Sequence, residues 1–328
     1  MIHSLRHCVC WLLAALALTA QAAVNSMTTM TTPQLTRIKI ATIGAPNVEE
    51  IATLYQRWLD YEIAETGELS EALASSWGTP ASAGRPYVML QPASGDDVYI
   101  RAVEIDAVSD YRAMTTLGWN AIEIIVDDVY ATRKKLEESP FKIIGEPHSL
   151  GGQFASIHAM QFLGPAQEVV YLTMETGDRA KSTLPIPKSP IDRTFIMILA
   201  GHDLAELIDF YAGKFALNRI PVFPAQLDLV REAQGLPEGH EFSMSLLRGA
   251  QRGNNIELDG YPLSAGQRQS NPGQLPPGVA MTTFSVPDLD QLDLEFIEPP
   301  QVLYGNRRAA TFVGPAGELT ELLEEPAE

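Results

Sequence analysis

The chain has 328 residues, of which 45% are hydrophobic and 20% are charged, a composition typical of globular proteins with one large or two ordinary cores. Its formal net charge is −18, and the acidic residues are spread along the chain without forming a tail. A surface of this sign repels nucleic-acid backbones and anionic membranes, so we expect neither as a partner.

Residues 1–23 have the pattern of a secretory signal peptide. A short start that carries Arg6 is followed by an apolar run over residues 8–20, and Ala20-Gln21-Ala22 offers small residues to a peptidase. The apolar run is short for a membrane span, which makes an uncleaved anchor the weaker alternative. We expect cleavage near Ala22 and a protein that is secreted or periplasmic.

The two cysteines, Cys8 and Cys10, both lie within this segment. The mature chain would therefore have no thiol for a disulfide, for nucleophilic catalysis or for metal binding. Residues 24–34 are polar and repetitive, which predicts a disordered linker.

The next residues predict two rounds of one strand, one helix and three strands. The apolar alternation of strands and the i, i+3, i+4 spacing of helices both appear. Asn47 is the expected N-cap of the first helix. The predicted strands are 37–43, 61–65, 87–91, 98–105, 121–126, 141–145, 155–162 and 168–174, and the predicted helices are 47–60 and 128–138.

The second half of the chain repeats the first. Residues 40–55 resemble residues 196–211, with Asp203 in the place of the Asn47 cap, and both stretches end in an aromatic pair or Leu-Tyr. "AIEIIVDDV" aligns with "MTTFSVPDL", and "FLGPAQEVVYLTM" aligns with "FVGPAGELTELLE". These landmarks keep their order after about 150–160 residues, which indicates internal duplication. We predict one module over 35–177, a proline-containing linker over 178–190 and a second module over 191–325.

These motifs resemble the vicinal oxygen chelate superfamily, which includes glyoxalase I, extradiol dioxygenases and bleomycin-resistance proteins. The resemblance rests on the strand–Asn/Asp–helix opening, on "IEIIVDDV" and on the closing "GPAGELTELLE". It implies an α+β fold with two tandem modules, each made of paired βαβββ units whose sheet curls into an open cup. Such a cup is expected to hold a small-molecule ligand.

Metal-using members of this superfamily place His or Gln on the first strand of each unit and Glu on the last strand, where a divalent ion binds two adjacent substrate oxygens. The resemblance places the first-strand positions at Ile40, Ala121, Ile196 and Met281. It places the last-strand positions at Glu104, Tyr171, Glu257 and Glu321. Because the first-strand side chains offer no hard ligand, we predict no cofactor. A divalent metal stays an alternative, held by Glu257 and Glu321 or by displaced ligands drawn from Glu104, Glu123 and His158.

Without a metal, a cup is still a concave site lined by a few polar groups. Strand alternation predicts ligand contacts from the side chains of Tyr99, Arg101, Trp119, Asn120 and Glu104. Aromatic walls beside Arg101 would suit a flat, partly anionic or carbonyl-bearing molecule. The competing interpretation assigns most of these aromatic residues to the core.

Proton abstraction next to a carbonyl needs a general base and a group that stabilises the resulting oxyanion. Glu123 is the candidate base, and His158 and Tyr171 are the candidate partners. The leading prediction is therefore an exported glyoxalase-like protein that binds a small organic molecule, with metal-independent lyase or isomerase chemistry. The alternatives are a metal-dependent lyase or dioxygenase with displaced ligands, and a non-catalytic scaffold.

Overall fold

The computed structural model describes residues 32–325. The predicted signal peptide 1–23 and most of the predicted linker 24–34 lie outside these residues. Among the helices that are described, none has the length and apolar character needed to cross a bilayer.

The described chain contains four successive units that each begin with a long buried strand. Unit 1 consists of β1 (Ile38–Ala45), α2 (Val48–Leu59), β2 (Tyr61–Glu68), α3 (Glu71–Ser76), η1 (Pro80–Ser82), β3 (Pro86–Pro92) and β4 (Tyr99–Glu104). Unit 2 consists of β5 (Gly118–Val126), α4 (Val129–Lys135), η2 (Leu136–Glu138), β6 (Lys142–Ser149), η3 (Gly152–Phe154), β7 (Ile157–Leu163) and β8 (Val169–Glu175).

The second half repeats this plan, except that unit 4 has a 3-10 turn in place of an α-helix. Unit 3 consists of β9 (Ile191–Gly201), α5 (Leu204–Phe215), β10 (Asn218–Arg219), β11 (Phe223–Ala225), α6 (Asp228–Ala233), β12 (Phe242–Arg248) and β13 (Asn255–Gly260). Unit 4 consists of β14 (Gly278–Val286), η4 (Leu289–Gln291), β15 (Gln301–Tyr304), β16 (Arg307–Val313) and β17 (Leu319–Glu324).

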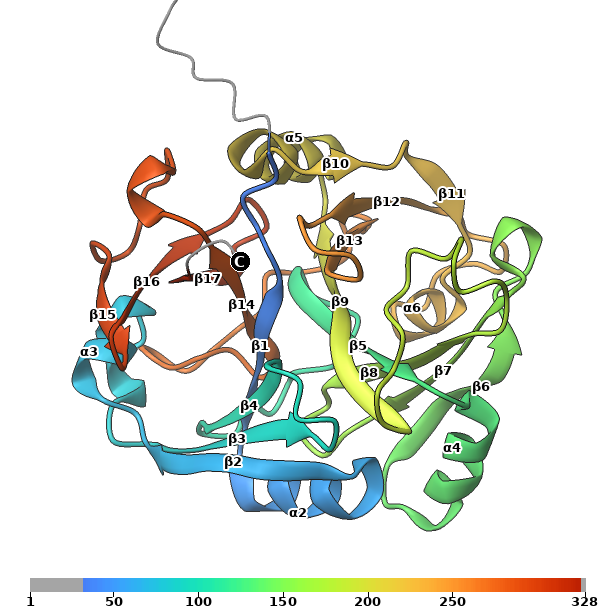
Figure 1. Ribbon diagram of the computed structural model, residues 1–328, viewed down its shortest axis with the longest axis horizontal. Helices are drawn as coiled ribbons and strands as arrows, with labels where there is room; N and C mark the ends of the chain where they lie inside the picture. Colours follow the sequence, from blue (N-terminus) through green and yellow to red (C-terminus); the bar gives the residue numbers. More distant parts are fainter. Residues whose placement is uncertain (1–31, 326–328) are drawn as a thin grey trace, which may run out of the picture. The chain divides into compact units, whose positions relative to one another are not determined.

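The strands form two curled sheets (Figure 1). The first sheet has the order β15-β16-β17-β14-β1-β4-β3-β2 and the second has the order β10-β12-β13-β9-β5-β8-β7-β6, with β11 paired to β12. Each sheet combines two units through antiparallel pairing of their first strands, β1 with β14 and β5 with β9. The predicted α+β fold of paired βαβββ units that curl into cups is confirmed.

The partners within each sheet differ from those expected. The duplication suggested that units 1 and 2 share one cup and units 3 and 4 the other, whereas the sheets join unit 1 to unit 4 and unit 2 to unit 3. All four first strands are buried along their whole length. Their apolar pattern makes each of them an acceptable partner for any other, so the sequence did not distinguish between the possible pairs.

The predicted helix caps are present in units 1 and 3. Asn47 accepts a hydrogen bond from the Glu50 amide at the start of α2, and Asp203 accepts one from the Glu206 amide at the start of α5, both at 3.0 Å. Unit 4, for which a helix was also expected, has only the 3-10 turn η4. Pro299 and Pro300 end the segment in which this helix would form, and the residue before a proline is disfavoured in a helix.

In both copies of the "GPA-E" motif, the chain forms a turn whose backbone donates a hydrogen bond to a buried glutamate. In unit 2, Glu168 accepts hydrogen bonds from the Ala166 amide at 2.9 Å and from the Tyr55 hydroxyl of α2 at 3.1 Å. A Cβ atom on Gly164 would lie 1.8 Å from a Glu168 oxygen, so only glycine fits at this position. The contact joins the helix of unit 1 to the last turn of unit 2.

Unit 4 repeats this arrangement with the helix of unit 3. Glu318 accepts hydrogen bonds from the Ala316 amide at 2.8 Å and from the Tyr211 hydroxyl at 2.6 Å, and a Cβ on Gly314 would again lie 1.8 Å from the carboxylate. Burial raises the pKa of both Glu168 and Glu318 to about 7. The two sequence repeats are thus each held together by a Tyr–Glu contact, although their units belong to different sheets.

Candidate functional site

Four side chains meet at the centre of the first sheet. Thr42 of β1 is the register partner of Arg101 of β4, and Thr283 of β14 is the partner of Glu321 of β17. Register partners share a face of the sheet, so each pair projects to the same side. Since β1 and β14 lie between β4 and β17, the contact between Arg101 and Glu321 shows how strongly this sheet curls.

This register corrects the positions expected from the sequence. The first-strand residues in register with Arg101, Tyr171, Glu257 and Glu321 are Thr42, Glu123, Ile198 and Thr283. The expected residues Ile40, Ala121, Ile196 and Met281 pair two positions earlier, with Tyr99, Val169, Asn255 and Leu319. The last-strand position of unit 1 is Arg101 and not Glu104, which pairs with Ala45 at the end of β4. The first-strand error is a slide of two residues, which preserves the face of the strand and is hard to detect in an apolar run.

Arg101 is the best-connected of the four side chains, and it is only 1% exposed. Its Nε and Nη2 atoms donate to Thr42 Oγ1 at 3.1 and 2.9 Å, and its Nη1 donates to the Tyr304 hydroxyl at 2.7 Å. Nη2 lies 3.5 Å from a Glu321 oxygen, and the guanidinium carbon lies 4.3 Å from the centre of the Trp77 ring. Arg101 is thus held by one carboxylate, two hydroxyls and one aromatic face.

Glu321 is fully buried and equally well satisfied. Its carboxylate accepts from Trp77 Nε1 and from Thr283 Oγ1, both at 2.7 Å, and from the Tyr304 hydroxyl at 3.0 Å. Burial by itself would lower the pKa of Arg101, but Tyr304 and Glu321 outweigh this effect and raise it. Arg101 and Glu321 therefore form a buried ion pair.

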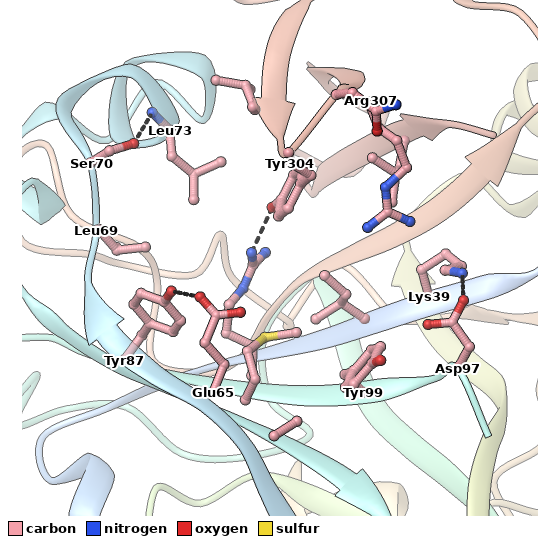
Figure 2. A pocket seen from close by; sticks show the side chains of 18 of the residues that line it. Lys39, Glu65, Leu69, Ser70, Leu73, Tyr87, Asp97, Tyr99, Tyr304 and Arg307 are labelled. Atoms are coloured by element: carbon pink, nitrogen blue, oxygen red, sulfur yellow. Dashed lines mark hydrogen bonds and ion pairs between the residues drawn. The ribbon is translucent and has the colours of Figure 1, made fainter. Parts of the chain in front are cut away.

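A cavity of about 590 Å³ opens above this centre, between unit 1 and the β15–β16 hairpin of unit 4 (Figure 2). Tyr87, Tyr99 and Tyr304 supply aromatic surface at its wall. The apolar lining residues include Ile40, Leu69, Leu73, Met89, Leu303 and Leu323. This mixture of apolar surface and a few polar groups is typical of small-molecule sites.

The cations of the cavity are already neutralised. Lys39 forms ion pairs with Asp97 and with Glu325, the latter at 2.9 Å, and Arg307 also pairs with Glu325. Arg101 is held by the buried carboxylate at the sheet centre.

Two carboxylates of the cavity have no such partner. Glu65 and Glu68 line one end of it, and among residues 32–325 neither forms an ion pair with Lys, Arg or His. Glu65 accepts a hydrogen bond from the Tyr87 hydroxyl, and burial together with this bond raises the pKa of Tyr87 to about 12. The uncompensated charge of the cavity is therefore negative.

The second sheet gathers acids instead. Glu123 of β5 is the register partner of Tyr171 of β8, and Glu257 of β13 is the partner of Ile198 of β9. Asp259 follows two residues after Glu257 on the same face of β13 and is 2% exposed.

These acids have few local partners. Thr173 donates to Glu123 at 2.6 Å, whereas the Oδ1 atom of Asp259 has no hydrogen-bond partner among the described residues. Burial raises the pKa of Glu123 and of Asp259 to about 7. The pKa of Glu257 is also raised, first by burial and then by the charges of Asp259 and Glu123. Burial therefore raises the pKa of all three acids of this sheet.

The structure separates several residues that were predicted to act together. His158 lies on the helix-covered face of the second sheet, where Nδ1 is 2.8 Å from the Tyr130 hydroxyl, whereas Glu123 and Tyr171 face the cup. His158 therefore cannot join them in one catalytic set. Glu257 and Glu321 belong to different sheets and cannot share one ion.

The predicted ligand-binding residues are also divided. Tyr99 and Arg101 line the cavity of the first sheet, but Arg101 is fully engaged in the buried network. Trp119 is 1% exposed and donates to the Leu319 carbonyl at 2.8 Å, and Asn120 donates to backbone carbonyls near its own strand. These two residues, with Glu104, lie outside the cavity lining.

Sequence reasoning missed the contributions of Tyr304, Trp77 and Glu65 to this site. Tyr304 belongs to unit 4, so its contact with Arg101 could be foreseen only if unit 1 was known to pair with unit 4. One signal was available in the last strands. When "YIRAVE" is aligned with "LTELLE" by their apolar residues, Arg101 occupies the position equivalent to Glu321.

The residues present do not fit the divalent metal implied by the superfamily resemblance. In the first sheet the four central positions provide one carboxylate, two hydroxyls and a guanidinium whose charge repels a divalent ion. In the second sheet Tyr171 and Ile198 occupy two of the four positions. Within the described residues, no group of three or more His, Cys, Asp or Glu side chains is placed to hold an ion.

Comparison with solved structures identifies the fold. Glyoxalase I from Zea mays superimposes with a TM-score of 0.59 at 15% sequence identity, covering 88% of this chain and 92% of that chain. A protein from Bacillus subtilis described as a putative dioxygenase superimposes with a TM-score of 0.60 at 13% identity, covering 90% of this chain and 87% of that chain. No known family model matches the sequence, and no curated protein is significantly similar to it.

Proposed function

We propose, from the vicinal oxygen chelate fold that this chain has, that the protein binds a small organic molecule in the cavity of the first sheet. The observation that carries this proposal is the cavity of about 590 Å³ with three tyrosines in its lining. A volume of this size holds a compact organic molecule rather than a polymer.

The charges in the cavity indicate which ligand it would accept. Arg101, Lys39 and Arg307 each face a carboxylate of the protein, so none of them is free to recognise an anion. Glu65 and Glu68 offer carboxylate oxygens, and the nearby tyrosine rings can receive a cation on their faces. We therefore propose a ligand with an aromatic or aliphatic body and an amine, in place of the anionic or carbonyl-bearing molecule expected from the sequence.

A thermal-shift comparison of matched compounds tests this function. Aryl-alkyl amines are compared with aryl-alkyl carboxylates of the same size, and the amines are expected to raise Tm by a few degrees while the carboxylates are not. In the double variant Glu65→Gln/Glu68→Gln this preference should disappear. Glu62→Gln, a change at an exposed glutamate of the same strand outside the cavity, serves as the matched control.

A shift with the carboxylates alone would contradict the proposed ligand chemistry. No shift with either series would contradict ligand binding in this cavity and would favour the scaffold alternative.

A second candidate function, metal-independent proton transfer, is favoured by one observation in the second sheet. Glu123 has a pKa raised to about 7 and lies beside Tyr171, whose phenol stays protonated because burial raises its pKa. A carboxylate that titrates near neutral pH is suited to act as a general base, and a phenol can donate to an oxyanion. Such a pair would perform the isomerase or lyase chemistry predicted from the sequence, without His158.

This second candidate can be tested without knowing the substrate. Carbonyl compounds with exchangeable α-protons are incubated with the protein in deuterated water and followed by NMR. Exchange that is lost in Glu123→Gln and reduced in Tyr171→Phe would support proton transfer in this cup. Equal exchange in the wild type and in Glu123→Gln would exclude Glu123 as the base.

We also propose that the protein is exported, because residues 1–23 match a signal peptide. Expression of the full chain followed by fractionation and N-terminal sequencing tests this proposal. A mature chain that begins near Ala23 in the periplasm or medium is expected, and an intact chain in the cytoplasm would contradict it.

A further inference from the structure

The centre of the first sheet combines two features that are seldom found together. Its strand register brings four side chains to one point, as a divalent ion would require, yet one of the four carries a permanent positive charge. We propose that the guanidinium of Arg101 replaces the divalent cation at the centre of this sheet and that it organises the groups around it as an ion would.

The contacts of Arg101 support this assignment. An ion at this point would draw the oxygens of Thr42, Tyr304 and Glu321 toward it, and all three lie within 3.5 Å of the guanidinium nitrogens instead. These oxygens come from β1, β15 and β17, so Arg101 connects unit 1 to two strands of unit 4. A planar guanidinium with five donors can hold several oxygens at once, which an ammonium group on a flexible stem does less well.

The burial of Glu321 explains why a cation is needed here. The Glu321 side chain is fully buried, and a buried carboxylate without a cation is costly. Both side chains of the ion pair are at most 2% exposed. A divalent ion could not enter beside the guanidinium, because like charges repel strongly at such distances in a buried site.

Arg101 also positions Tyr304, the residue through which the buried pair reaches the cavity. The Tyr304 hydroxyl accepts from Arg101 at 2.7 Å and donates to Glu321 at 3.0 Å, while its ring faces the cavity (Figure 2). Arg101 is therefore a positioning residue, which fixes one aromatic wall of the site without requiring contact with the ligand.

The assignment is tested by exchanging the guanidinium for a carboxylate. Arg101→Glu places two buried carboxylates at this centre and removes the cation, so it should be strongly destabilised but should gain affinity for a divalent ion with hard oxygen ligands. With 1 mM Mn²⁺ we expect its Tm to rise by about 4 °C or more, with about one Mn²⁺ per chain by elemental analysis. Wild type and Arg101→Met should show neither effect.

Arg101→Glu/Glu321→Gln is the matched control, since it restores a single carboxylate and should lose the response to Mn²⁺. The proposal is overturned if Arg101→Glu folds without any response to Mn²⁺. It is also overturned if the wild type binds stoichiometric Mn²⁺ that Glu321→Gln abolishes.

If Arg101→Glu does not fold with or without Mn²⁺, Arg101→Ala decides. Guanidinium ions at a few millimolar should raise the Tm of Arg101→Ala by a few degrees relative to the same concentration of NaCl, and should not raise that of the wild type. No difference between the two salts in Arg101→Ala would overturn the proposal.

Discussion

In the first sheet the four central positions include a cation and an anion, Arg101 and Glu321, beside two threonines. In the second sheet the four central positions are Glu123, Tyr171, Ile198 and Glu257, so they carry two acids and no cation. The first centre contains a cation and an anion that form a buried ion pair. The second contains acids whose pKa values are raised, by burial for Glu123 and by burial and neighbouring acids for Glu257.

The difference shows how one strand framework accommodates two kinds of centre. The four positions of the first sheet are buried, and in the second sheet Glu123 and Ile198 are buried while Tyr171 and Glu257 are partly exposed. Net charge at a buried position must be neutralised. In the first sheet a neighbouring side chain neutralises it, and in the second a proton does. Removing the cation of the first centre should therefore lower the free energy of unfolding, whereas removing an acid of the second centre should reduce the loss of stability at higher pH.

The largest effect is expected from Arg101→Met. This change leaves Glu321 buried without its cation and should lower the free energy of unfolding by about 3–5 kcal/mol. Chemical denaturation measures the loss. The double variant Arg101→Met/Glu321→Leu should recover part of it, because no charge is then buried. Equal losses in the single and double variants would show that the ion pair is not what stabilises this centre.

A second prediction concerns the turn that the repeats share. Gly164→Ala and Gly314→Ala each place a Cβ 1.8 Å from the carboxylate of Glu168 or Glu318, which must then leave its Tyr partner. Each change should cost about 2–3 kcal/mol, through overpacking and a broken buried hydrogen bond. The two losses should be similar, and a tolerated Gly164→Ala beside a severe Gly314→Ala would show that the repeats are not equivalent.

The third prediction is a pH effect of the second sheet. The folded-state pKa of Glu123 is raised to about 7, so its protonated form favours folding, and this stability is present below pH ~4.5 and is lost as pH rises through 7. Glu168 and Glu318 contribute in the same direction. The free energy of unfolding should fall between pH 5 and pH 8.

Glu123→Gln should make this fall smaller by about 1–2 kcal/mol, because an amide has no proton to lose. The measurement is denaturant unfolding at a series of pH values. An unchanged pH slope in Glu123→Gln would show that Glu123 is already ionised at pH 5. Glu62→Gln, an exposed change, should leave the slope as it is.

The smallest effect is expected from Gly213→Ala in α5. This glycine is exposed within the helix, and a Cβ there meets no atom within 4 Å. Alanine should raise the free energy of unfolding by about 0.5–1 kcal/mol, since it restricts the unfolded chain and favours the helix. This variant also serves as a stabilising reference for the two glycine changes in the turns.

The sequence predicted the strands and most of the helices because each has strong local signals, such as the Asn47 and Asp203 caps and the apolar alternation of β1 and β9. It did not predict that β1 pairs with β14, because four buried apolar strands carry no mark of their partner. The site depended on that pairing. Tyr99 lines the cavity from a strand of unit 1, whereas Tyr304 reaches it from the opposite end of the chain.

The prediction of a helix in unit 4 was wrong for a different reason. The βαβββ plan of the resemblance implied a helix in unit 4, whereas the structure has only the 3-10 turn η4 between Pro287 and Pro299. His158 was grouped with Glu123 because both lie on strands of the same unit, and the sequence does not show which face of a sheet is concave. Helix α4 packs on the face of the sheet that carries His158, so the other face forms the cup. This packing is tertiary structure and leaves no local signal in the sequence.

The pairing of β1 with β14 also sets the order in which the molecule can assemble. The second sheet is built from units that follow one another, so its strands are all available once residue 260 has been synthesised. The first sheet joins residues near Ile40 to residues near Thr283, and Glu321 arrives only with the last strand. Strand β1 can pair with β4 of its own unit, but its other edge stays unpaired until β14 has been synthesised. If the chain is exported unfolded, β1 and β14 can pair only after both ends of the chain have crossed the membrane.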